Sequence, residues 1–179
     1  ALAPKNPVEY EHYNQWIAFC QENQLNNSHF EVGRVIDFPE LVKGSDLCIT
    51  TSLREGFGMA YMEPWLYQTP VVGRKIDYIT RDFLNKGLTF NGLYESIILP
   101  GQNADFKDLE TKNQMYEILK ARHNPARIKE IFAHNTPLKE LLKQVDKNTI
   151  EANIKRIIQH YSPESYGKKI METYHGLPG

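Results

Sequence analysis

The sequence is poor in cysteine, has no excess of either charge and contains no long apolar run. Two cysteines among 179 residues, Cys20 and Cys48, exclude a disulfide framework and fit a reducing, cytoplasmic setting. Because 21 basic residues stand against 22 acidic ones, we do not expect the basic surface of a nucleic-acid-binding protein. No apolar run reaches the roughly 18–20 residues of a membrane-spanning helix.

What is present has the composition of one globular domain. Hydrophobic residues make up 41% of the chain, and the length lies within the usual domain size of about 100–200 residues. The chain opens on Ala1, and its first residues lack the pattern of a signal peptide, so we do not expect them to act as one. We therefore expect a single domain over residues 1–179 that is truncated at its N-terminus.

Strand-like and helix-like segments alternate along the first part of the chain. This alternation predicts βαβ units on a parallel sheet flanked by helices, an α/β part of about residues 1–100, and a helical part of about residues 101–179. We expect strands at 30–38, 47–51, 69–73 and 96–100, and helices at 8–25, 39–43, 56–67, 79–86, 105–123, 125–134, 137–145, 149–161 and 163–175. Ligands of such sheets bind beyond the carboxyl ends of the strands, here at the loops 33–37, 52–58 and 73–78.

The most informative segment is a glycine-rich turn between a strand and a helix. Gly56 and Gly58 allow a sharp turn and a close approach to the backbone. The N–H groups at the start of the following helix lack intrahelical partners, and the helix dipole favours an anion there. Glu55 lies at the turn and Glu63 about two helical turns further on, so the segment suits phosphates flanked by two carboxylates that accept hydrogen bonds from hydroxyl groups. An acidic helix start with no ligand is the alternative for Glu55–Gly58.

This segment resembles the C-terminal, donor-binding domain of retaining GT-B glycosyltransferases, the glycosyltransferase group 1 family (family 4). That family carries two glutamates separated by seven residues. The first begins an E-G-F-G motif, here Glu55–Gly58, and the second, here Glu63, is followed by a G-x-P-V-V segment, here Gln68–Val72. The similarity extends upstream to residues 30–37 and downstream to residues 161–166. It implies a Rossmann-like half of a GT-B enzyme whose acceptor-binding domain is absent from this chain.

The resemblance also implies roles for individual residues. Glu55 would contact hydroxyls of the donor sugar and act at the catalytic centre, and Glu63 would bind the ribose. The donor would be a UDP-, GDP- or ADP-sugar, with no metal or other cofactor. The donor-binding residues would be Glu55, Gly56, Phe57, Gly58 and Glu63, with possible base or diphosphate contacts from Arg34, Val35, Arg74 and Lys75.

The chain departs from the family pattern at several positions. Pro64 replaces the alanine that usually follows the second glutamate, and Gln68 replaces a common glycine. The loop 73–77 lacks the usual diglycine, so Arg74 or Lys75 would supply charge for the diphosphate, unless both are ordinary surface cations. The family's upstream Arg/Lys pair would precede Ala1.

Two functions follow from these observations. The first is the donor-binding half of a glycosyltransferase (hexosyltransferase type, EC 2.4), inactive as this fragment alone, which transfers a sugar with retention to a glycan, lipid or small-molecule acceptor. The alternative is a non-catalytic module that binds a nucleotide or nucleotide sugar. Lysines on the amphipathic helices of the last third leave peripheral contact with the cytoplasmic membrane face as a further possibility.

Overall fold

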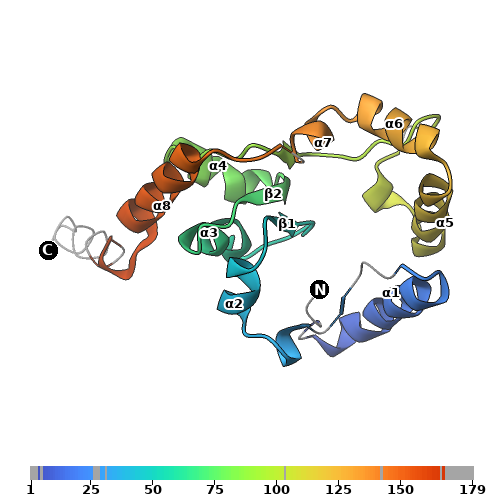
Figure 1. The fold of residues 1–179 in the computed structure, drawn as a ribbon, viewed down its shortest axis with the longest axis horizontal. Coiled ribbons are helices and arrows are strands. Elements are labelled where there is room, and N and C mark those ends of the chain that lie inside the picture. Colours follow the sequence, from blue (N-terminus) through green and yellow to red (C-terminus); the bar gives the residue numbers. More distant parts are fainter. Residues whose placement is uncertain are drawn as a thin grey trace, which may run out of the picture. The chain divides into compact units, whose positions relative to one another are not determined.

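The computed structural model describes residues 4, 6–25, 29–30, 32–102, 104–141, 143–165 and 167. It divides the chain into two compact units, Ala1–Gly44 and Ser45–Gly179. Among the described residues, no helix combines the length and the apolar character needed to cross a bilayer. The two units are described separately below (Figure 1).

The regular elements among the described residues of the first unit are all helices. It contains η1 (Pro7–Glu9), α1 (Tyr10–Glu22), η2 (Val32–Arg34) and α2 (Phe38–Lys43). The Asn6 side chain accepts a hydrogen bond from the N–H of Val8 and so caps η1. Helices α1 and α2 confirm the expected helices at 8–25 and 39–43, with shorter or shifted ends.

The strand expected at 30–38 is wrong. The chain forms the 3-10 helix η2 there, and the N–H groups of Val35 and Ile36 donate to the carbonyl of Val32 at 3.0 Å. The β-branched and aromatic residues of this segment favour a strand only when a neighbouring strand pairs with it. The described residues of this unit contain no such strand, so local hydrogen bonds satisfy the backbone instead. Residue 31 lies outside the described part.

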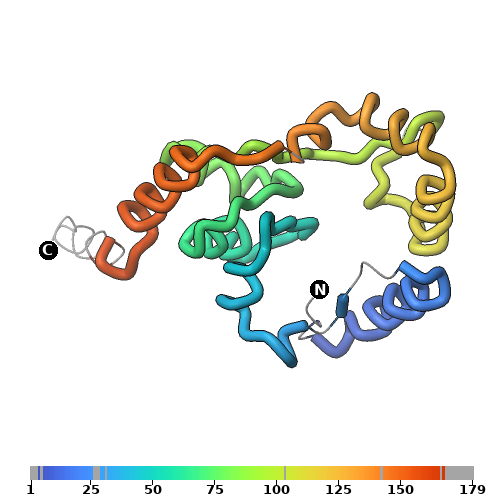
Figure 2. The backbone as a smooth tube through the Cα atoms, in the orientation of Figure 1, coloured from blue at the N-terminus to red at the C-terminus, as the bar shows by residue number. Residues whose placement is uncertain are grey.

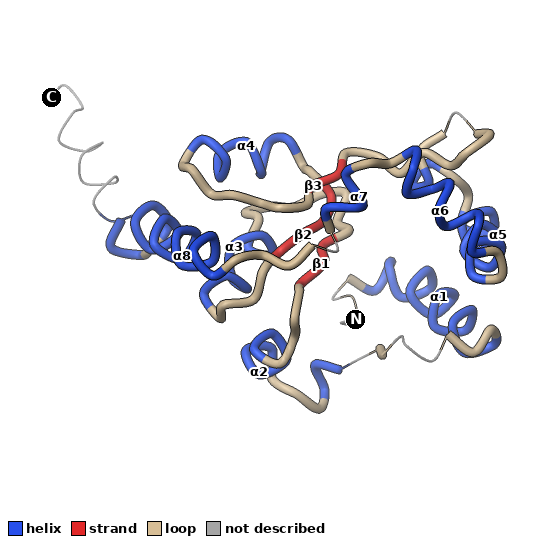
Figure 3. Tube along the Cα trace, turned by 45° about the horizontal axis from the view of Figure 1, so that its top comes forward, coloured by secondary structure: helices blue, strands red, loops and turns tan. Residues whose placement is uncertain are grey.

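The second unit is built on a three-stranded parallel sheet. Its strands β1 (Cys48–Thr50), β2 (Val71–Arg74) and β3 (Leu93–Tyr94) lie side by side in that order (Figure 3). The register pairs Cys48 with Val71 and Gly73 with Leu93. Helices α3 (Met59–Leu66) and α4 (Asp77–Asn85) connect successive strands, so the predicted βαβ units and the α/β class are confirmed.

The last expected strand is misplaced. Strand β3 lies at Leu93–Tyr94, and residues 96–100 contribute only an isolated antiparallel bridge between Ile98 and Asp105. Side chains take the place of a partner strand, since Asp105 accepts from the N–H of Ile97 at 3.0 Å and Asn135 accepts from that of Ile98 at 2.7 Å. These bonds satisfy the backbone without a strand ladder.

A helical segment follows the sheet. It comprises η3 (Phe106–Asp108), α5 (Thr111–Arg122), α6 (Pro125–His134), α7 (Pro137–Glu140) and α8 (Lys147–Tyr161). Helix α6 has the expected bounds, whereas α7 is shorter than the expected helix at 137–145. Residues 163–165 are helical, but most of the helix expected at 163–175 lies outside the described residues.

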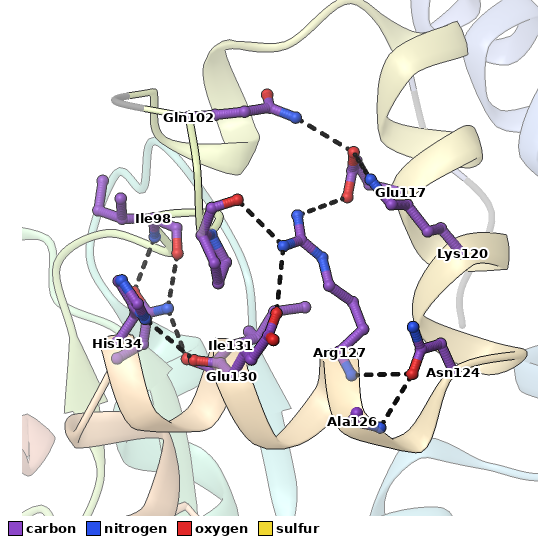
Figure 4. A network of polar contacts seen from close by, with 12 residues as sticks. Ile98, Gln102, Glu117, Lys120, Asn124, Ala126, Arg127, Glu130, Ile131 and His134 are labelled. Atoms are coloured by element: carbon purple, nitrogen blue, oxygen red, sulfur yellow. Dashed lines mark hydrogen bonds and ion pairs between the residues drawn. The ribbon is translucent and has the colours of Figure 1, made fainter.

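A buried ion pair holds α5 to α6. Arg127 on α6 contacts Glu117 on α5 at 3.1 Å and also donates to the carbonyl of Pro100 at 3.0 Å. Gln102 donates to the second carboxylate oxygen of Glu117, and Lys120 lies 3.5 Å from that oxygen (Figure 4). Glu117 and Arg127 are both buried, and each neutralises the charge of the other. A buried charge without such a partner would lower the stability of the fold.

Helix α8 returns to the sheet from the far end of the sequence. Figure 2 shows this C-terminal helix running beside the green segment that holds α3 and α4. Ile157 joins the hydrophobic core formed by α3, β2 and α4, and the core includes Tyr61 and Trp65, which are fully buried. Asn153 both accepts from the N–H of Thr89 and donates to its carbonyl, at 2.9 and 2.8 Å. These contacts make α8 part of the layer that supports the loops beyond the strands.

Candidate functional site

The loop between β1 and α3 carries the predicted site. Residues Glu55–Gly58, here called the EGFG loop, end where α3 begins, and Gly58 is the N-terminal cap of that helix. No side chain caps α3. Within the described part of the chain, the N–H groups of residues 56–60 have no hydrogen-bond partner. The predicted cluster of open backbone donors at a helix start is therefore present in the structure.

Glycine suits positions 56 and 58 of the EGFG loop for different physical reasons. Gly58 has a φ of 71°, and a Cβ there would overlap Cγ2 of Ile79 and lie 3.0 Å from the Phe83 ring. Only glycine fits that position without strain. A Cβ at Gly56 would meet no atom within 4 Å. Gly56 thus leaves open space beside the backbone, where a ligand can approach.

The side chains predicted to bind the donor differ in how much of their surface is exposed. Glu55 is partly buried at the start of the loop, and Phe57 is 81% exposed at its tip. Glu63 is partly buried in α3. Neither carboxylate forms a hydrogen bond or ion pair with another described residue, so both retain their acceptor capacity for a ligand.

Two tyrosines fix the loop relative to the strands. The buried hydroxyl of Tyr61 in α3 donates to the carbonyl of Arg74 at 2.6 Å, and burial raises the pKa of Tyr61 to about 12. This bond ties the start of α3 to the end of β2. The hydroxyl of Tyr78 in α4 contacts both backbone groups of Glu55 at 3.0 Å. The loops after β1 and β2 are therefore joined at the carboxyl edge of the sheet.

Arg74 and Lys75 occupy different environments. Arg74 is only 7% exposed; its guanidinium donates to the carbonyl of Glu95 at 2.7 Å and lies 3.4 Å from Asp105. It also lies 5.1 Å from the centre of the Tyr94 ring. Arg74 therefore has an internal structural role, and the alternative that it is a surface cation is wrong.

Lys75 is the more accessible of the two cations. Its ammonium contacts Glu95 at 2.7 Å and Asp77 at 3.2 Å, and these hydrogen bonds raise the pKa of Lys75. Arg81 and Lys75 together lower the pKa of Asp77. Lys75 remains charged at neutral pH, but a diphosphate would have to compete with two carboxylates for it.

The other predicted contacts lie in the first unit. Arg34 ends η2, and Val35 follows it with 87% of its surface exposed. Their part in a base-binding site remains a prediction.

A cavity of about 720 Å³ adjoins the EGFG loop. Gly56, Phe57 and Tyr78 lie on its loop side, and apolar side chains of α3 and α4 line its interior. Tyr161 and Asp82 meet at its border, where the tyrosine hydroxyl donates to the carboxylate at 2.6 Å. Burial, followed by this carboxylate, raises the pKa of Tyr161. The volume lies in the range of small-molecule sites.

Sequence reasoning missed Tyr78. It singled out the loop 73–78 but gave no role to this side chain, whose contact with Glu55 spans 23 positions. The available signal was a hydroxyl-bearing aromatic residue at the first turn of the helix after β2, at the edge where the loops meet.

No group of three or more His, Cys, Asp or Glu residues within the described ranges is arranged to hold a metal ion.

The parallel sheet and the EGFG loop are typical of the Rossmann-like α/β class. A parallel strand followed by a glycine-containing turn and a helix with free N–H groups is an arrangement that can bind anions. Residues 10–97 match the model of the family described as glycosyl transferases group 1. The match includes the EGFG loop and Glu63 and supports a role in glycosyl transfer. Searches of curated proteins and of solved structures found no match.

Proposed function

We propose that this chain is the donor-binding part of a glycosyltransferase that moves a sugar from a nucleoside-diphosphate sugar to an acceptor with retention of configuration. One observation carries the proposal: the EGFG loop presents a run of unpartnered N–H groups at the start of α3. Such groups bind phosphate oxygens, and the dipole of α3 adds to the attraction. The family match over the same residues supports the same chemistry.

The two glutamates extend this anion site to the ends of the donor. Glu55 would accept hydrogen bonds from sugar hydroxyls on one side of the diphosphate. Glu63 would accept from the vicinal hydroxyls of the ribose. Both carboxylates are partly buried and unpaired within the described residues, so each can form charge-assisted hydrogen bonds with hydroxyl donors.

The chemical step needs stabilisation of the leaving group. When the anomeric C–O bond breaks, negative charge develops on the diphosphate and positive charge on the sugar ring. The unpartnered N–H groups of the EGFG loop would stabilise the former by donating hydrogen bonds to the diphosphate oxygens as these gain charge. Lys75 would add a positive charge at the neighbouring loop.

A non-catalytic nucleotide-binding module remains the second candidate. The placement of Arg74 favours it, because this guanidinium is buried against Asp105 and leaves Lys75 as the cation of the loop after β2. Weaker neutralisation of the diphosphate would permit binding but reduce the stabilisation of a leaving group.

Binding measurements on the full-length protein test the proposal. A panel of UDP-, GDP- and ADP-sugars is first screened by thermal shift. With the best binder, Glu55→Ala and Glu63→Ala should each weaken binding. Only Glu55→Ala should leave the affinity for the free nucleoside diphosphate unchanged, since Glu63 contacts the ribose and Glu55 the sugar.

Glu110→Ala is the matched control, because Glu110 is exposed and its side chain makes no capping bond. If neither glutamate variant changes the affinity for any nucleotide sugar, the site is assigned wrongly. If both behave as expected but the wild-type protein transfers sugar to no acceptor in a broad screen, the non-catalytic module is the better account.

A further inference from the structure

The contact between Tyr78 and Glu55 has an unusual form. A single hydroxyl donates to the carbonyl of Glu55 and accepts from the N–H of the same residue, both at 3.0 Å. One oxygen can meet both groups only when they face the same side of the backbone. The two bonds therefore restrict φ and ψ of Glu55 together, and with them the direction of its Cα–Cβ bond.

The support behind Tyr78 is rigid. It lies in the first turn of α4, next to Ile79 and Thr80, which are 8% and 0% exposed. The Thr80 hydroxyl is bonded to the carbonyl of Ile76. Ile79 and Phe83 from the same helix close around Gly58 at the other end of the EGFG loop. Helix α4 thus holds the loop at both ends, by packing at Gly58 and by hydrogen bonds at Glu55.

The middle of the loop has no comparable support. Gly56 and Phe57 are exposed, and their N–H groups have no partner among the residues that the structure describes. The Glu55 carboxylate likewise forms no hydrogen bond there. Without Tyr78, Glu55 would become ordered only when the ligand binds. The free energy needed to order this residue would then reduce the affinity for the ligand.

We propose that Tyr78 is a positioning residue, which orients Glu55 toward the sugar of the donor through its backbone. This inference rests on the proposed function of the EGFG loop. It assigns Tyr78 no contact with the substrate. The hydroxyl acts only through Glu55, so its removal should matter only while the Glu55 carboxylate is present.

The test is a double-mutant cycle with Tyr78→Phe and Glu55→Ala in the full-length protein, using the UDP-, GDP- or ADP-sugar that the wild-type protein binds. Tyr78→Phe should raise the dissociation constant of the nucleotide sugar about tenfold, because ligand binding would then have to order the backbone of Glu55. The dissociation constant of the free nucleoside diphosphate should change less than about twofold. In the Glu55→Ala background, Tyr78→Phe should have no further effect on nucleotide-sugar binding.

Tyr116→Phe is the matched control, because Tyr116 is 62% exposed, close to the 63% of Tyr78, and lies on α5. The inference is overturned if Tyr78→Phe leaves nucleotide-sugar binding unchanged, or if it weakens binding equally with and without Glu55. A wild-type protein that binds no nucleotide sugar, or a Glu55→Ala variant that binds normally, overturns the proposed function itself.

Discussion

Gln68 takes a left-handed backbone conformation, with a φ of 64°, in the turn that joins α3 to β2. Its N–H donates to the carbonyl of Trp65, and the next residue donates to that of Pro64. Glycine is the usual residue at such a helix end, since it has no Cβ to clash with the backbone. A glycine at this position would therefore avoid backbone strain that Gln68 tolerates.

Replacement of Gln68 by glycine should therefore stabilise the protein. We expect the free energy of unfolding to rise by about 0.5–1 kcal/mol. Glycine removes the cost of the left-handed conformation, roughly 1–2 kcal/mol for an L-residue, but its greater freedom in the unfolded chain cancels part of this stabilisation. Urea denaturation measures the change. Gln68→Ala keeps the strain and serves as the control; an equal gain from alanine would show that backbone strain is not the cause.

At the scale of single residues, the sequence predicted the site in part. The spacing of Glu55, Gly56 and Gly58 indicated a turn with open N–H groups, since glycine and helix-start physics act locally. For Arg74 the sequence left two alternatives, a surface cation or a phosphate ligand, whereas the structure buries this side chain. Its partner Asp105 lies 31 positions away, and no local pattern reveals such a pairing.

At the scale of secondary-structure elements, helix α6 shows what a local pattern can determine. Pro125 starts the helix, and the Asn124 side chain caps it by accepting from the N–H groups of Ala126 and Arg127. Both signals are visible in the sequence, and the predicted bounds are confirmed. The segments 30–38 and 96–100 were predicted wrongly because a strand depends on a partner, and side chains such as Asp105 and Asn135 can replace that partner.

The junction of α5 and α6 should depend strongly on its ion pair. Arg127→Met leaves the Glu117 carboxylate buried without its main partner, and we expect a loss of about 3–5 kcal/mol in the free energy of unfolding. Thermal or urea denaturation measures it. Lys129→Met is the control, since Lys129 is exposed on the same helix.

The double variant Glu117→Leu/Arg127→Met separates the charge from the packing. Most of the lost stability should return, because two apolar side chains leave no unpaired buried charge. A double variant as unstable as Arg127→Met alone would contradict the electrostatic explanation.

At the scale of the whole molecule, the two units differ in how much apolar surface they bury. Phe19 and Val42 are the buried hydrophobic side chains among the described residues of Ala1–Gly44, and all the others identified lie in Ser45–Gly179. The single domain expected over residues 1–179 stays a prediction, and composition alone does not reveal how unevenly the buried side chains are distributed.

Hydrogen exchange should reflect this difference. We expect amides of β2, whose residues are all buried, to exchange slowest, and amides of α1, where only Phe19 is buried, to exchange much faster. Mass spectrometry of peptic peptides measures both in one experiment. Equal protection of α1 and β2 would contradict the expectation and indicate that the first unit draws stability from contacts beyond its own buried side chains.

Helix α8 has a consequence for the order in which the newly made protein can fold. Trp65 and Ile157 belong to the same core, but Ile157 is added to the growing chain about ninety residues after Trp65. At roughly 5–20 residues per second, the nascent sheet spends several seconds with this apolar surface uncovered. During translation, this interval gives a chaperone the opportunity to bind the unfinished core.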